Sequence, residues 1–408
     1  MTRQRIDHRT AVTKLRLVDW KGVPFANQEV QVKQINQEVL FGCGVPHVVE
    51  NPETEGNERT AEFEDCMGKW LDLFNYGTLH FYWGRFEQEE GKPNTFRMLR
   101  AANYLKDHHV TLKGHPLCWH TVCADWLLKY SNQEILEKQK ARIRRDVSDF
   151  KGIVDYWDVI NEVVIMPDYD RYDNAMTRVC KELGRVKMVK TMFDEAKAAN
   201  PESHLLINDF NLSTNYEILI DGCLNAGVPI DAIGIQTHQH QGYMGEARLH
   251  EILHRFEQFK LPLHFTENTL ISGDLMPKSV GDLNDFQPKE WPTTPEGEAR
   301  QAEQTEEMYR ILFEHPQVEA ITAWDFADGA WLGAPSGIVR KDYSLKPVYH
   351  TLNHLIHEEW QTNATLKTDE NGWITLDGYR GEYEITIGNH IGTHRLRKNE
   401  ESATTQLL

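Results

Sequence analysis

Eight short apolar segments alternate with segments of helical period along most of this chain, and that alternation limits the fold more than any other feature. The apolar segments cover residues 39–45, 78–82, 111–117, 155–162, 204–210, 232–238, 261–267 and 320–326, and helical patterns include 132–150, 185–200, 246–259 and 294–315. Most of the eight are apolar on both faces, as strands are when helices cover both sides of a sheet. Eight strand-then-helix units favour an α/β protein with a closed (β/α)8 TIM barrel over an open doubly wound sheet.

The two ends of the chain have a different pattern. Residues 10–36 alternate polar and apolar side chains around Lys21-Gly22, and residues 362–387 do so around Asn371-Gly372. Such alternation with a glycine turn is typical of antiparallel strands. We expect residues 39–360 to form the barrel, and residues 1–38 and 361–408 to be β segments that pack together as one small antiparallel β module. Two independent hairpins are the alternative, and residues 395–408 are predicted to be frayed.

Length and charge exclude several classes of partner. A chain of 408 residues suits one large domain with an accessory piece. It has 44 basic and 62 acidic residues, a net charge of −18 and no dense Lys/Arg cluster. Nucleic acid and anionic membrane both require a basic surface, so neither is an expected partner. No window approaches the ~20 apolar residues of a membrane span. A neutral polysaccharide is compatible with this composition, and oligomeric state is left open.

The cysteines and the N-terminus bear on the compartment. The six cysteines are scattered without a CxxC pair: Cys43, Cys66, Cys118, Cys123, Cys180 and Cys223. This spacing is typical of free thiols in a reducing compartment rather than of disulfides or a zinc site. The first residues lack the apolar segment of a secretion signal. We therefore expect a cytoplasmic protein, or a secreted one whose leader is missing from this sequence.

Two glutamates end predicted strands. Glu162 closes the segment 155–162, and Glu267 closes the segment 261–267. In a (β/α)8 barrel, the C-terminal ends of the strands carry the active site. Cleavage of a glycosidic bond needs one carboxyl that protonates the leaving oxygen and a second that supports or attacks the sugar, about 5 Å away in retaining enzymes. The pair predicts a glycoside hydrolase.

Polar and aromatic side chains at the same predicted strand ends suit a sugar pocket. The Asn161 amide is placed to bond a sugar hydroxyl, and His238 is placed to hold the Glu267 carboxylate, with Gln236 on the same side of its strand. Either His115 or His120 lines the pocket while the other packs. Tryptophan faces stack on sugar rings, and the eighth segment supplies two. The proposed substrate-binding set is Asn161, His120, Gln236, His238, Trp324 and Trp331. The long loop 272–292 follows Glu267 and either overhangs the site or is merely solvated.

These motifs, taken in order, resemble glycoside hydrolase family 10, the (β/α)8 retaining endo-β-1,4-xylanases. Residues 114–126 resemble the family's GHxLxWHxxxPxW, 155–162 its WDVxNE, 207–211 its NDYN, 261–267 its LPxxxTE, and 321–349 its tryptophan segment ending in Lys-Pro-x-Tyr. The resemblance covers about residues 39–360 and implies that Glu162 is the general acid/base and Glu267 the nucleophile. It places Asn161, His120, Gln236 and His238 around the sugar, with the two tryptophans as walls. The flanking β segments resemble the ends of some longer members.

The chain also departs from the family pattern. Where the family has T-x-E-N-x-M-K-W, residues 78–85 read Thr-Leu-His-Phe-Tyr-Trp-Gly-Arg. The Glu-Asn pair and the Lys that grip xylose in the family are absent, and His80, Tyr82 and Arg85 stand in that region. Asn268-Thr269 replaces the usual Leu-Asp after the nucleophile, and Cys123-Ala124 replaces Thr-Pro. Xylose selectivity is therefore left more open than the chemistry.

The expected function is hydrolysis of internal β-1,4 linkages of xylan or xylo-oligosaccharides by double displacement, with no metal or cofactor. Three alternatives remain. The same mechanism can act on a different β-glycan or an imported oligosaccharide, or the barrel can bind carbohydrate without catalysis. His238 and His240 with acidic neighbours suggest a metal-dependent hydrolase.

Overall fold

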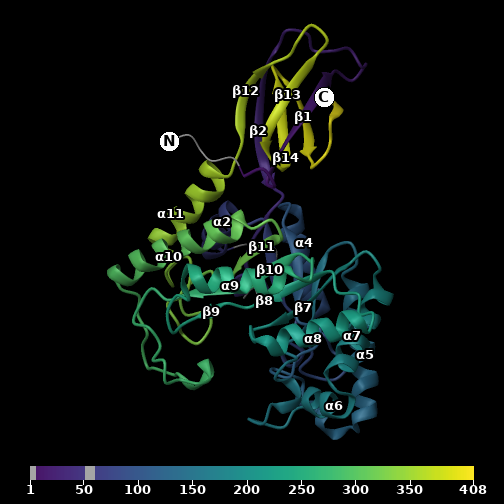
Figure 1. The fold of residues 1–408 in the computed structure, drawn as a ribbon, viewed down its shortest axis with the longest axis vertical. Helices are drawn as coiled ribbons and strands as arrows, with labels where there is room; N and C mark the ends of the chain where they lie inside the picture. The colour runs from purple at the N-terminus through teal and green to yellow at the C-terminus, as the bar shows by residue number, and fades with distance from the viewer. Residues whose placement is uncertain (1–5, 51–59) are drawn as a thin grey trace. The chain divides into compact units, whose positions relative to one another are not determined.

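The computed structural model of the chain describes residues 6–50 and 60–408. Two compact units make up the chain: Phe41–His350 form one, and Met1–Leu40 with Thr351–Leu408 form the other. Each unit is described by itself below (Figure 1).

The first unit is built on a closed ring of eight strands, which confirms the predicted (β/α)8 barrel. The strands follow the order β3-β4-β5-β6-β7-β8-β10-β11, and pairing of β11 with both β3 and β10 closes the ring. The strands are β3 (Leu40–Gly44), β4 (Tyr76–His80), β5 (Thr111–His115), β6 (Tyr156–Asn161), β7 (His204–Asp209), β8 (Ala232–Ile235), β10 (Leu263–Leu270) and β11 (Val318–Ala323), with β9 (His238–Gln239) added beside the end of β10.

Helices and short helical turns follow the barrel strands. They are α1 (His47–Glu50), α2 (Ala61–Leu73), α3 (Trp83–Phe86), α4 (Thr95–Asp107), α5 (Asn132–Asp149), α6 (Ala175–Leu183), α7 (Arg185–Ala199), α8 (Thr214–Asn225), α9 (Gly245–Glu257), α10 (Pro295–Glu314) and α11 (Pro347–His354), with short helical turns η1 (Asp125–Lys129), η2 (Met166–Asp168), η3 (Leu283–Asp285) and η4 (Leu355–Glu359). Local sequence explains where the predicted helices begin. Ser131 and Glu134 form a capping box at the start of α5, and Thr294 caps α10, whose first residue is a proline.

Two barrel strands differ from their prediction. The expected segment 232–238 is interrupted, and its end becomes the separate strand β9. Strand β10 continues to Leu270 because Thr269 and Leu270 pair with His238 and Gln239. Glu267 therefore lies within a strand rather than at its tip, and it is fixed by neighbours on both sides.

The second unit contains two small sheets built from both chain segments. One has the order β13-β1-β16, and the other β12-β2-β14-β15. The purple N-terminal strands lie among yellow C-terminal strands in Figure 1. Their bounds are β1 (Thr10–Val18), β2 (Glu29–Gln37), β12 (Asn363–Lys367), β13 (Trp373–Tyr379), β14 (Gly381–Ile387), β15 (His390–Leu396) and β16 (Ser402–Gln406). The predicted β module is confirmed, and the alternative of two independent hairpins is wrong because β1 and β2 belong to different sheets.

The prediction of a frayed C-terminus is also wrong. Strand β16 pairs in parallel with β1, from Lys14 opposite Ser402 to Val18 opposite Gln406. Leu407 is fully buried and joins an apolar core drawn from both sheets, which includes Leu15, Val32 and Tyr383. Alternation along β1 and β2 turns every second side chain into this core. The polar C-terminal segment is therefore ordered by pairing with the edge of β1. Its composition alone does not predict this pairing.

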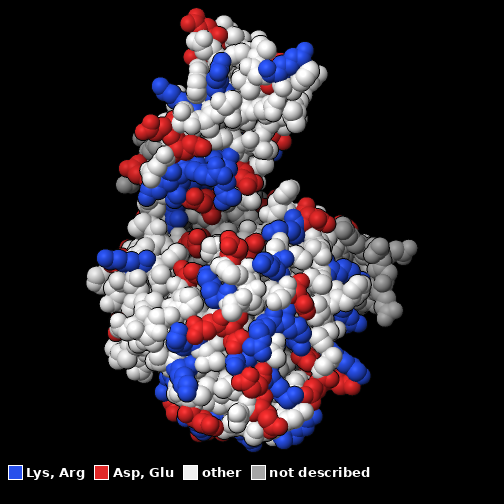
Figure 2. Space-filling model, turned by 90° about the vertical axis from the view of Figure 1, so that its right-hand side faces the viewer, with Lys and Arg blue, Asp and Glu red and all other residues white. Residues whose placement is uncertain are grey.

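The charged side chains can be followed on one face of the molecule. On the side drawn in Figure 2, groups of blue Lys and Arg are bordered by red Asp and Glu. Among residues 6–50 and 60–408, no helix combines the length and apolar character needed to cross a membrane. Five of the six cysteines are buried and all six are free thiols.

Candidate active site

Glu162 and Glu267 are delivered by strands β6 and β10. Glu162 directly follows β6 with φ of 55°, in the left-handed region that non-glycine residues seldom occupy. Its backbone N–H donates to the carbonyl of Asn208 at 2.8 Å, which holds the turn against β7. Backbone strain of this kind persists where surrounding structure fixes it, and it is common at functional sites.

A network of amides links the two carboxylates. Asn208 Nδ2 donates to Glu267 Oε1 at 2.8 Å and to Asn161 Oδ1 at 2.9 Å. Gln236 Nε2 lies 2.9 Å from Asn161 Oδ1 and 3.4 Å from Glu162 Oε1. The structure therefore brings together the predicted residues Asn161, Gln236, Glu162 and Glu267, and it adds Asn208, which sequence analysis did not single out.

Two histidines flank the oxygens of Glu267. His238 Nε2 lies 3.0 Å from Oε2, as predicted for this residue, and His115 Nε2 lies 4.0 Å from Oε1. Burial alone raises the pKa of Glu267, but the hydrogen bond from His238 and the nearby charges of His115, His238 and Lys113 outweigh it, so that the pKa lies below its ordinary value. Glu267 is thus held as the anion.

Glu162 has the opposite electrostatics. Burial, followed by the charge of Glu267, raises the pKa of Glu162 to about 8. Trp119 Nε1 donates to Glu162 Oε2 at 2.8 Å and orients the carboxyl. One carboxyl is therefore protonated at neutral pH and its neighbour is ionised, the division of roles that acid-assisted attack requires.

A glycine makes room for the amide network. An added Cβ at Gly234 would come within 2.9 Å of Asn208 Cγ and closer still to its Oδ1. We expect Gly234→Ala to displace the Asn208 amide from Glu267 and to lower kcat roughly tenfold to 10²-fold, because small misplacements of reacting groups are costly. Steady-state kinetics with a thermal melt measures this. Gly222→Ala in α8, where the new methyl meets only Val186 at 3.4 Å, is the matched control; full activity of the Gly234 variant contradicts the expectation.

Aromatic rings surround the carboxylates. The Trp331 ring lies 4.5 Å from His238, and the Trp324 ring lies 5.3 Å from His115. Both predicted tryptophans therefore adjoin the histidines of the site. His120 instead packs against Trp119 at 6.2 Å and Tyr169 at 4.5 Å, and burial lowers its pKa to about 4. His115 is the histidine of this segment that lies beside Glu267.

The altered second-strand segment also reaches the site. Tyr82 packs edge-on against His115 at 5.7 Å and in a tilted arrangement against Trp119 at 5.5 Å. His80 meets Trp324 edge-on at 5.6 Å, and the Arg85 guanidinium lies 5.5 Å from the Tyr82 ring. His80 and Tyr82 thus pack against the rings that adjoin the two carboxylates, in the segment where the family pattern has Glu, Asn and Lys.

The loop 272–292 lies beside the site. The Met276 N–H donates to the His240 carbonyl at 2.9 Å, and the Trp291 ring is 6.1 Å from that of His240. Arg171, in the segment after β6, forms ion pairs with Asp282 and Asp285 of this loop. The loop 272–292, which follows β10, is therefore tied by ion pairs to the segment that follows β6. These are the two strands that deliver Glu267 and Glu162.

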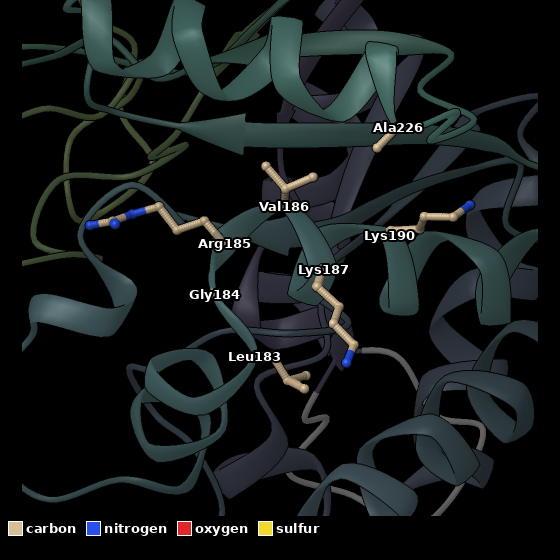
Figure 3. Close-up of a pocket in the computed structure, with 7 residues that line it drawn as sticks. All are labelled: Leu183, Gly184, Arg185, Val186, Lys187, Lys190 and Ala226. Carbon is tan, nitrogen blue, oxygen red and sulfur yellow. The ribbon is translucent and has the colours of Figure 1, made fainter.

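A surface hollow and the possible metal ligands can be compared with these side chains within the described residues. In the described part of the chain, no group of three or more His, Cys, Asp or Glu side chains is arranged to hold a metal ion. His240 Nδ1 lies 3.3 Å from the Thr269 hydroxyl. An open hollow of about 520 Å³ lies at the start of α7, lined by Arg185, Lys187 and Lys190 among others, and it contains none of the site residues (Figure 3).

A closed (β/α)8 barrel that presents one protonated and one ionised carboxyl at the same rim is that of a glycoside hydrolase. The model of glycosyl hydrolase family 10 matches residues 80–354, more than half of the chain, and the protein belongs to this family.

Relatives support the assignment. The chain is 24% identical over 414 residues to anti-sigma-I factor RsgI6 of Acetivibrio thermocellus, covering 96% of this chain and 47% of that protein. It is 26% identical to endo-1,4-beta-xylanase B of Thermotoga neapolitana, covering 68% of this chain and 78% of that one. It spans only 39% of an endo-1,4-beta-xylanase/feruloyl esterase of Xylanibacter ruminicola, at 25% identity over 64% of this chain. The chain thus covers half or less of two of these curated relatives.

Solved structures share the fold. Xylanase 10B from Thermotoga maritima aligns with a TM-score of 0.63 at 22% identity, covering 79% of this chain and 96% of that one. A family 10 structure from Paenibacillus barcinonensis aligns with a TM-score of 0.64 at 21% identity, over 78% and 95%.

Proposed function

We propose that this protein is a retaining endo-β-1,4-xylanase, with Glu162 as general acid/base and Glu267 as nucleophile. The observation that carries the proposal is the amide network in which Asn208 contacts Glu267, Gln236 contacts Glu162, and both donate to Asn161. The raised pKa of Glu162 and the lowered pKa of Glu267 support the two roles. Membership of family 10 and relatives named endo-1,4-beta-xylanase support xylan as the substrate class.

The mechanism is a double displacement. Glu162 donates its proton to the leaving oxygen while Glu267 attacks the anomeric carbon, and a covalent glycosyl–enzyme forms. Consumption of the Glu267 charge removes one cause of the raised pKa of Glu162. Glu162 then takes a proton from water, which attacks the same face that the leaving group vacated and restores Glu267. Two inversions give net retention.

The remaining predicted residues bind the sugar at the cleaved bond. We assign hydrogen bonding of sugar hydroxyls to Asn161, Gln236 and His238, and the flat walls of the pocket to Trp324 and Trp331. His120 keeps its proposed place at the sugar pocket, since its ring packs beside Trp119, whose indole donates to Glu162. His115 instead lies beside Glu267.

Incubation with xylan, xylo-oligosaccharides and mixed-linkage β-glucans tests the proposal. We expect xylan to release a ladder of oligosaccharides with an early fall in viscosity, and proton NMR to detect the β-anomer first. An initial α-anomer, or no new reducing ends from any glycan, refutes the mechanism. Faster cleavage of another β-glycan keeps the mechanism and changes the substrate, and binding without cleavage supports a non-catalytic barrel.

A further inference from the structure

A buried chain of charges lies behind the nucleophile. Lys113 and His115 are two residues apart on β5, so their side chains point to the same side of that strand. Asp158 comes from the neighbouring strand β6. The Lys113 ammonium is 2.8 Å from Asp158 Oδ2, and His115 Nδ1 is 2.7 Å from the same oxygen. All three side chains are at most 1% exposed.

The two histidines at Glu267 are supported differently. Behind His238, Nδ1 faces only the Thr269 hydroxyl at 3.4 Å. Behind His115, Nδ1 faces the Asp158 carboxylate, which is itself paired with Lys113. A carboxylate on Nδ1 fixes the ring with its proton on that nitrogen and favours positive charge on the ring. Only one of the two histidines therefore has ionic support.

Burial of the Lys113 ammonium is costly in free energy. Taking a lysine and an aspartate out of water costs several kcal/mol per ion, and apolar replacements of such pairs are often as stable. The Lys113–Asp158 pair is therefore not expected to add much to the free energy of folding. The position of Lys113, two residues from His115, instead allows its charge to act on Glu267.

We propose that Lys113 is a positioning residue that, through Asp158 and His115, keeps Glu267 in the anionic form that attacks the sugar. The proposal rests on the proposed function of Glu267. The groups that face Glu267 are Lys113 and His115 from β5, Asp158 and Glu162 from β6, Asp209 from β7, and His238 from β9. Glu162 is neutral at rest, and burial raises the pKa of Asp209 to about 7. Lys113 lies behind these groups, paired with Asp158.

The test is the pH dependence of kcat/KM for an activated aryl xyloside. Loss of a nearby opposite charge raises a carboxyl pKa, and a rise of about one unit is expected here because Lys113 acts on Glu267 through Asp158 and His115 rather than by direct contact. At acidic pH, kcat/KM falls as Glu267 takes up a proton, and this part of the profile is called the acid limb. Lys113→Met is expected to move the acid limb to higher pH by about one unit, so that kcat/KM at a given acidic pH falls about tenfold. KM at the pH of maximal activity is expected to change little. Lys113→Arg keeps the charge and is expected to restore the limb. Lys346→Met, which removes a different fully buried lysine paired with Asp328 at 2.6 Å, is expected to lower the melting temperature and leave the limb in place.

Two further measurements separate the possible failures. Lys113→Met/Asp158→Asn leaves no unpaired buried charge, so it is expected to fold and to shift the limb in the same direction. NMR titration of ¹³C-labelled Glu267 reads its ionisation without turnover. A wild-type acid limb and an unchanged Glu267 titration in both variants overturn the proposal. Absence of hydrolysis by the unaltered protein, with the titration still shifted, counts against the proposed function alone.

Discussion

Glu267→Ala is expected to lower kcat roughly 10⁴-fold or more, since removal of a covalent nucleophile leaves only binding and the remaining polar groups to assist. The side chain is 4% exposed and is held by Asn208 and His238, so no neighbouring carboxylate takes its place. Release of reducing ends from xylan measures the loss.

Azide provides the sharper part of this test. The alanine leaves space for a small anion below the anomeric carbon, so azide is expected to restore partial activity on an aryl glycoside and to give the α-glycosyl azide. Glu303→Ala, an exposed change on α10, is the control and is expected to retain full activity. A Glu267 variant as active as this control, or rescue with a β-azide, contradicts the assignment.

Glu162→Ala is expected to separate substrates by their leaving groups. With xylan, whose leaving alkoxide needs a proton, kcat/KM should fall about 10²–10⁴-fold, the usual contribution of a positioned acid. With a dinitrophenyl glycoside, which leaves without a proton, formation of the glycosyl–enzyme should be little affected, and a burst of phenol should precede slow turnover. Equal losses on both substrates would assign Glu162 a purely structural role.

The pH profile gives an independent check on both carboxyls. Glu162 must carry a proton and its pKa is about 8, so kcat/KM of the unaltered protein falls as pH rises through about 8. Glu267 must be ionised and its pKa lies below the ordinary value of a glutamate, so kcat/KM falls again only at a pH more acidic than that ordinary value. In Glu162→Ala the basic limb should disappear with activated substrates while the acid limb remains.

Much of the barrel could be predicted because its strands are apolar on both faces and regularly spaced. Strand β8, for example, is four buried residues ending just before Gln236. Strand β16 could not be predicted in the same way, since Ser402–Gln406 is a polar segment without a clear alternation. Residues 402–406 form a strand because they pair with the edge of β1. Such pairing outweighs the low β-propensity of a polar segment.

The residues of the site can also be divided into those that the sequence predicts and those that it does not. Glu162 and Glu267 could be singled out because each closes an apolar segment of the sequence, although β10 in fact continues past Glu267. Their proposed roles come from the resemblance to the family and not from their spacing. The choice between His115 and His120 was not, because both lie in one motif and only the direction of β5 decides which ring meets Glu267. Lys113 and Asp158 look in the sequence like ordinary charges within strands; their importance depends on a pairing between β5 and β6 that spans 45 residues.

The interleaving of the two chain ends in one β unit has a consequence for synthesis. Strand β1 pairs with β13 and β16, and β16 ends at Gln406, 388 residues after β1 ends at Val18. At ~5–20 residues per second, a ribosome needs roughly 20–80 s to cover that distance. During this interval the nascent chain carries the unpaired edges of β1 and β2 while the barrel residues emerge and fold. Premature termination anywhere before residue 363 leaves those edges permanently open, ready to pair with another chain.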